Sequence, residues 1–145
     1  MISQLERLTN EEQHMVLKAP VLVSVLASCS PHKINQSQKA DAIKLAHLKT
    51  FASVPLLFPY YAEVEKDFKR KFEEAAEKFF PFDEANQAKL RNKINRVYTI
   101  IGKLDNEYAA VLHKSLDDYT KHVKKAAHSI FQDFIFPLPI EGLSS

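Results

Sequence analysis

The side chains that could do chemistry are few, and they do not gather at the spacings that catalysis requires. Cys29 is the only cysteine and stands three positions before His32, so a thiol and an imidazole could lie near each other. A nucleophile needs an adjacent base, but a cysteine at the end of an apolar segment is more often a small core residue. The sequence therefore indicates no catalytic residue.

One pair of residues has the spacing of a metal site. Glu11 and His14 form a Glu-x-x-His pair, the unit that di-iron four-helix proteins use twice. The pair falls in the first turn of an expected helix, where Thr9 and Glu12 can form a capping box. We interpret this segment as a helix cap rather than a metal site.

The remaining histidines and the glycines also lack a functional spacing. His113, His122 and His128 are nine and six residues apart, whereas two ligands on one helix face need a separation of three or four. Loops that bind phosphate need glycines at fixed offsets, and Gly102 and Gly142 stand alone. We expect no cofactor.

The elements that must position these residues are predicted to be helices. Prolines punctuate long segments rich in Ala, Leu, Lys, Glu and Gln, and the apolar positions recur with the helical period. The pattern predicts an all-α fold, a compact bundle of about five to six helices in a single domain over residues 1–145. The predicted helices span residues 9–28, 35–54, 60–80, 83–104 and 106–135.

Three features of these helices can be interpreted in more than one way. Pro20 either kinks the first helix or separates two shorter ones. The stripe over 60–80 (Tyr61, Val64, Phe68, Phe72, Ala75 and Phe79) predicts one amphipathic helix. The last helix either continues for about 30 residues or breaks near residue 117. Residues 136–145 form an extended apolar tail, because two closely spaced prolines exclude a helix.

Aromatic side chains at the helix junctions and apolar ones in the tail exceed what a small core needs. They are either plugs between helices or an exposed patch that binds a partner. The candidate interaction surface comprises Phe58, Tyr60, Phe80, Phe82, Phe136, Leu138 and Ile140.

The charge and the hydropathy of the chain limit the classes of partner that we expect. The chain has 20 Lys and Arg against 18 Asp and Glu, and the basic stretch 83–103 is explained by a solvated helix face, so nucleic acid is not expected. The most apolar piece, residues 19–27, is too short for a membrane span. With a single cysteine and no apolar leader, the cytoplasm is the expected location.

The order of segments over residues 9–52 resembles the tellurite-resistance TerB-like helical domains. The similarity rests on Thr9-Asn10-Glu11-Glu12 opening an apolar helix, on the loop with Lys33-Ile34-Asn35, and less specifically on Tyr119-Thr120-Lys121-His122. In that family the loop typically reads Asp-Gly-x-Ile followed by Glu, and these acidic residues are associated with metal binding. Here Pro31, His32 and Gln38 occupy the corresponding positions, so the resemblance implies a scaffold that has lost its ion site.

Two functions fit these observations. The first is a non-enzymatic scaffold or protein-interaction domain, TerB-like, which binds a protein partner or a second copy through its aromatic junctions and tail. The alternative is a small-molecule binding or catalytic bundle with an interior pocket lined by Phe and Tyr. The candidate loop site in either case comprises Cys29, His32, Asn35 and Gln38.

We expect the chain to bind neither calcium nor magnesium more tightly than about 1 mM, the weak end of calcium modules. Hard cations need several anionic oxygens to offset the loss of hydration, and this loop offers amides, a hydroxyl and an imidazole. Weak zinc binding by Cys29 and His32 stays open. Calorimetric titration measures each affinity. Micromolar calcium binding that disappears on mutating residues 30–38 would contradict the prediction.

Overall fold

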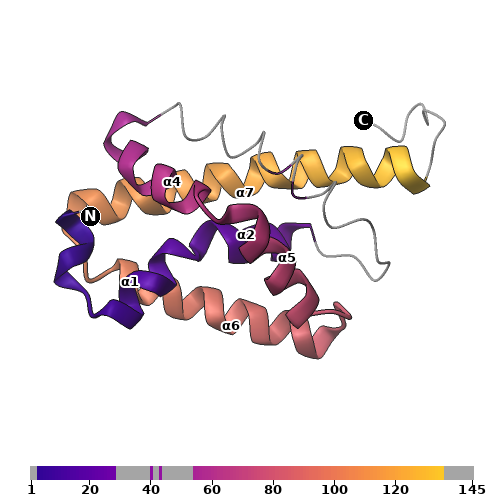
Figure 1. Ribbon diagram of the computed structural model, residues 1–145, viewed down its shortest axis with the longest axis horizontal. Helices are drawn as coiled ribbons and strands as arrows, with labels where there is room; N and C mark the ends of the chain where they lie inside the picture. Colours follow the sequence, from indigo (N-terminus) through magenta and orange to yellow (C-terminus); the bar gives the residue numbers. More distant parts are fainter. Residues whose placement is uncertain (1–2, 29–39, 41–42, 44–53, 136–145) are drawn as a thin grey trace.

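A computed structural model describes residues 3–28, 40, 43 and 54–135, with side chains described as far as residue 125. In this part of the chain every regular element is helical, which confirms the all-α fold class. The elements are the 3-10 helix η1 (Ser3–Arg7), α1 (Asn10–Leu17), α2 (Ala19–Ala27), the 3-10 helix η2 (Pro55–Leu57), α4 (Phe58–Glu65), α5 (Phe68–Lys78), α6 (Glu84–Ile101) and α7 (Asn106–Ile135). Figure 1 shows α6 and α7 along opposite edges of the bundle, with α2 between them.

The first predicted helix is divided in two at Lys18. The capping box at its start is confirmed, because the Thr9 side chain accepts the Glu12 N–H and the Glu12 carboxylate accepts the Thr9 N–H, both at 3.1 Å. Pro20 lies in the first turn of α2 and has no N–H to donate back to Val16. The Val16 carbonyl instead accepts a hydrogen bond from the buried Tyr60 hydroxyl at 2.8 Å.

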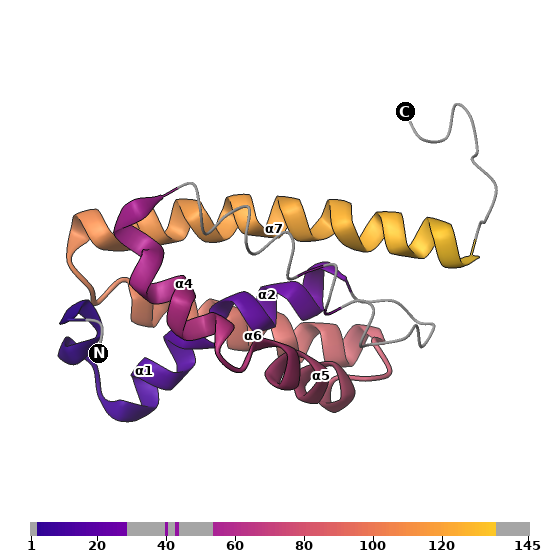
Figure 2. The same cartoon turned by 45° about the horizontal axis from the view of Figure 1, so that its top comes forward.

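The helix α2 is the centre of the bundle. Seven of its nine residues are buried, and it packs against α5, α6 and α7. A helix that is apolar on all sides is normally buried on all sides, and Figure 2 shows α7 above α2 with α5 and α6 below it. None of the described helices combines the length and the apolar character needed to cross a bilayer.

Buried hydroxyl groups connect α2 and α4 to α7. The Ser24 hydroxyl lies 2.6 Å from the Pro20 carbonyl and 2.8 Å from the Tyr119 hydroxyl. Since a hydroxyl has one hydrogen, Ser24 donates to Pro20 and accepts from Tyr119. The Tyr61 hydroxyl lies 2.6 Å from that of Ser115. These bonds satisfy polar groups that would otherwise be costly to bury, and they fix the position of α7.

The expectation of one helix over residues 60–80 is wrong, because the chain bends between α4 and α5 at Lys66 and Asp67. Neither proline nor glycine marks the bend, and the apolar stripe runs through it, with Val64, Phe68 and Phe72 all buried. The two helices pack on different partners, α4 against α1 and α5 against α2. The bend therefore lets one stripe reach two separate surfaces.

The helices α6 and α7 both begin at a capping aspartate. Asp83 accepts the Asn86 N–H at 2.8 Å, and Asp105 accepts the Tyr108 N–H at 3.4 Å. The helix α7 has 30 residues without interruption, so the unbroken alternative is confirmed over a break near residue 117. Its described stripe is buried at Leu112, Leu116, Tyr119 and Val123.

Several predictions concern parts of the chain outside the described residues. They are the candidate loop site, the tail 136–145 and most of the helix predicted over 35–54. Within that helix, Ala40 and Ile43 are described, and both are helical and buried as its apolar stripe requires.

Replacing Tyr60 by Phe should lower the free energy of unfolding by roughly 1–2 kcal/mol, because the buried Val16 carbonyl loses its hydrogen bond. The control is Tyr108→Phe, which removes a buried hydroxyl that has no hydrogen-bond partner in the described residues and should cost little. Pro20→Ala restores an N–H near Val16, so Tyr60→Phe should cost less in that background. Urea unfolding of the parent chain, the three single variants and the Pro20→Ala, Tyr60→Phe double variant measures these costs. Equal costs for the Tyr60 and Tyr108 changes would contradict the assignment.

Alkaline pH should unfold the chain through its buried tyrosines. Burial raises the pKa of Tyr61 to about 12 and raises the pKa of Tyr60 and of Tyr119. The unfolded chain loses these phenol protons near pH 10, so the stabilisation is complete below about pH 10 and is lost as the pH rises through the folded pKa values. The free energy of unfolding should therefore decrease as the pH is raised from about 9 to about 12. The decrease should be smaller in the Tyr61→Phe variant. An unchanged slope in that variant would show that Tyr61 takes no part.

Candidate functional site

The structure separates the members of the candidate interaction surface. Phe58 is 38% exposed beside Leu56 at 52%, and Phe80 is half-buried. Tyr60 and Phe82 are buried, so their assignment to the surface is wrong, and both are plugs within the core. Tyr60 is turned inward because its hydroxyl has a backbone partner on α1. The tail residues Phe136, Leu138 and Ile140 lie outside the described part of the chain.

The segment with the Glu-x-x-His spacing serves as a helix cap. The Glu12 carboxylate bonds the Thr9 backbone and also the Lys103 ammonium, which ties the start of α1 to the turn after α6. Hydrogen bonds from Lys103 and from the Thr9 backbone lower the pKa of Glu12. No group of three or more possible metal ligands occurs among the residues that the structure describes.

Aromatic side chains of the described interior pack against one another. Tyr60, Tyr61 and Tyr119 are fully buried, with the first two rings in edge contact at 5.1 Å between centroids. The rings of Phe68 and Phe72 are stacked with their centroids 6.0 Å apart, and both side chains are buried. The pocket described next is lined mainly by aliphatic and polar side chains, with Tyr98 as its one aromatic residue among those described.

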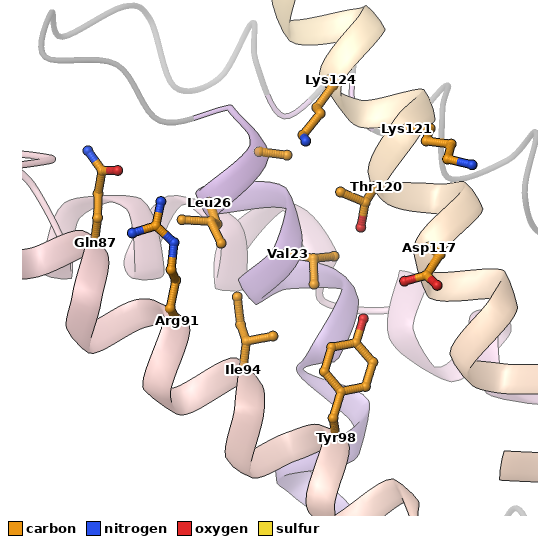
Figure 3. Close-up of a pocket in the computed structure, with 11 residues that line it drawn as sticks. Val23, Leu26, Gln87, Arg91, Ile94, Tyr98, Asp117, Thr120, Lys121 and Lys124 are labelled. Atoms are coloured by element: carbon orange, nitrogen blue, oxygen red, sulfur yellow. The ribbon is translucent and has the colours of Figure 1, made fainter. Parts of the chain in front are cut away.

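A groove of about 670 Å³ runs between α6 and α7, with α2 as its floor. We call it the α6–α7 groove. The floor is apolar and consists of Val23, Leu26 and Ala27, with Ile94 from α6. The polar lining residues are Gln87, Arg91 and Tyr98 of α6 and Asp117, Thr120, Lys121 and Lys124 of α7. Figure 3 shows the two polar walls facing each other across the floor.

The walls of the groove follow from helical periodicity. On α6 the lining positions 87, 91, 94 and 98 recur at spacings of four, three and four, so they form one face of that helix. Since each residue adds about 1.5 Å, this face is about 16 Å long. The helices α6 and α7 make few contacts with each other and many with α2, so α2 sets the width of the groove.

The two ends of the groove differ in charge. Arg91 and Lys124 lie toward one end, and Tyr98 and Asp117 lie toward the other (Figure 3). At the second end His113 Nδ1 is 3.5 Å from the Asp117 carboxylate, and its ring centroid is 4.7 Å from that of Tyr98. Burial, and then the charge of Asp117, raise the pKa of Tyr98. The cationic end therefore attracts anionic groups, and the opposite end does not.

The lining carries groups that can hold a ligand. The described lining residues include no Cys, Ser or His, and so none of the usual pairs of nucleophile and base. The Thr120 hydroxyl donates to the Leu116 carbonyl at 2.8 Å, so toward a ligand it can only accept. The guanidinium of Arg91 and the ammonium of Lys124 are donors for carboxylates.

The basic residues that line this groove are visible in the sequence, but a solvated helix surface explains them equally well. The basic stretch 83–103 and the lysines around His122 fit a solvated surface, and most of them are exposed. Only the placement of α6 and α7 on either side of α2 brings Arg91 opposite Lys124. Comparison of the chain with protein-family models, with curated proteins and with solved structures gives no match.

Proposed function

We propose that this chain is a non-enzymatic interaction domain that binds an acidic, amphipathic helix of a partner protein in the α6–α7 groove. The observation that carries the proposal is the combination of an apolar floor with cations on both walls. Helix-in-groove recognition uses this arrangement, because the partner buries an apolar stripe while its flanking side chains meet the rim.

The dimensions of the groove favour a helix of about three turns. The α6 wall is about 16 Å long, and three turns of helix have a length of about 16 Å. The floor residues Val23, Leu26 and Ala27 are spaced so that side chains three and four positions apart on a partner helix can pack against them.

The charge difference between the ends favours one orientation. The C-terminal end of a helix carries a partial negative charge, which carboxylates there would increase. Such an end fits beside Arg91 and Lys124, while the partly positive N-terminal end fits beside Asp117. We infer a partner helix whose acidic residues lie mainly in its last turns.

A second candidate is a small amphiphilic carboxylate. The groove volume of about 670 Å³ lies within the range of small-molecule sites, roughly 300–1,000 Å³. The apolar body of such a ligand would cover the floor and its carboxylate would meet Arg91 or Lys124. The α6 wall is about 16 Å long, which favours the helix.

The remaining expectations from the sequence form part of the same proposal. We infer a TerB-like scaffold whose acidic loop residues have been replaced, acting in the cytoplasm. Self-association would use the exposed Leu56 and Phe58 instead of the groove. Nucleic acid is a poor fit, because Asp117 and Asp118 interrupt the lysines of α7.

A photo-reactive amino acid at Gln87, in the full chain in its own cells, should crosslink to a segment with an apolar stripe and acidic flanks. Arg91→Glu combined with Lys124→Glu should reduce the crosslinked yield at least roughly tenfold, since like charges across an interface cost several kcal/mol. The matched control is Lys89→Glu, an exposed lysine of α6 that does not line the groove.

Mass spectrometry of the crosslinked product decides between the candidates. An acidic amphipathic peptide supports the helix, and a small carboxylate supports the second candidate. A product that forms equally well in the double variant, or a basic partner segment, would contradict the proposal.

A further inference from the structure

A second, smaller cavity lies on the other side of α6 from the groove. It has a volume of about 150 Å³ and lies between the start of α2, α5 and α6. Its polar lining consists of four lysines and one glutamate, and its apolar lining is Val21, Leu22, Ala75 and Phe79. The lysines are Lys18, Lys71, Lys78 and Lys93, and we call this site the lysine cavity.

Within the described part of the chain, the lysines of the cavity outnumber its acidic residues by four to one. Glu74, the acidic residue among the described lining residues, forms its ion pair with Arg70 at 3.1 Å. Within the described residues, none of the four cavity lysines takes part in an ion pair. Lys78 lies 5.7 Å from the centroid of the Phe79 ring, which leaves its charge unneutralised.

Lys93 is the most constrained of these groups. It is half-buried, and burial together with the charges of Lys78 and Lys18 lowers its pKa. Like charges held at the mouth of a partly apolar cavity repel one another more than they would in open water. An anion in the cavity would remove this repulsion and would gain several charged hydrogen bonds at once.

We propose that the lysine cavity is a binding site for a compact oxyanion of the phosphate class. Phosphate oxygens accept hydrogen bonds from several ammonium groups together, and lysine binds phosphate as a point charge without a fixed fork geometry. A cavity of about 150 Å³ accommodates a single phosphoryl group and little more of the molecule that carries it. The remainder of such a ligand would extend into solvent past the exposed Lys18 and Lys78.

The site is separate from the proposed interaction groove. Lys93 is two positions from Arg91, and a helix turns by about 200° over two residues. On α2 the cavity uses Val21 and Leu22, whereas the groove uses Val23 and Leu26. The anion proposal therefore does not depend on the identity of the groove partner.

The test compares inorganic phosphate with chloride at equal ionic strength, using the full chain. Phosphate should raise the melting temperature, and calorimetry should detect one saturable site. Lys93→Gln should abolish the phosphate-dependent rise and weaken binding at least roughly tenfold, since charged hydrogen bonds are the strong ones. Without phosphate, the same variant should be at least as stable as the parent chain, because it relieves repulsion.

Lys89→Gln is the matched control, because it removes one charge from α6 outside the cavity. Lys71→Gln serves as a second cavity variant should Lys93→Gln fail to fold. Vesicles of phosphatidylcholine with and without phosphatidic acid distinguish a lipid headgroup from a free phosphate. Binding in either form that depends on Lys93 or Lys71 supports the site. The proposal would be overturned if phosphate raised the melting temperature equally in Lys89→Gln and in the cavity variants. It would also be overturned if the parent chain bound neither phosphate nor vesicles that contain phosphatidic acid.

Discussion

Burial of most of α2 by three other helices is the constraint from which those helices take their places. Its sequence has no charged residue between Ala19 and Ala27, so no face of it is suited to water. The helices α5, α6 and α7 cover it, and the polar atoms it carries inward find partners. Ser24 bonds both its own helix and Tyr119, and Ser28 donates to the Ser24 carbonyl at 2.6 Å. A central helix of this kind needs surrounding helices rather than a facing sheet, and the whole bundle follows from that need.

Local signals in the sequence predict the helix ends well, whereas long-range geometry remains out of reach. The caps at Thr9 and Asp83 depend on residues within three positions, so the sequence specifies them directly. The bend between α4 and α5 depends on which surfaces the two halves pack against, and no residue at Lys66 or Asp67 marks it. The inward position of Tyr60 depends likewise on a carbonyl on another helix, 44 residues earlier in the chain.

The helix α6 contributes residues to both candidate binding sites, from two different faces. The helix α6 presents Arg91, Ile94 and Tyr98 to the groove and Lys93 to the lysine cavity. Neither face can be recognised from α6 alone, because charged residues on a helix surface are usually only solvated. The packing of α2 against α5 and α7 turns these surface residues into the walls of concave sites.

The distance along the chain between α2 and α7, the last of the helices that cover it, affects how the protein folds during synthesis. Ser24 and Tyr119 form a direct contact although 95 residues separate them. At ~5–20 residues per second of synthesis, the most apolar helix leaves the ribosome roughly 5–20 s before its partner exists. During that interval α2 is a short, uncharged, hydrophobic segment on a nascent chain, the kind of surface that chaperones bind and that aggregates when left exposed. The bundle is therefore completed only when α7 is made, and α7 then covers the side of α2 that carries Ser24.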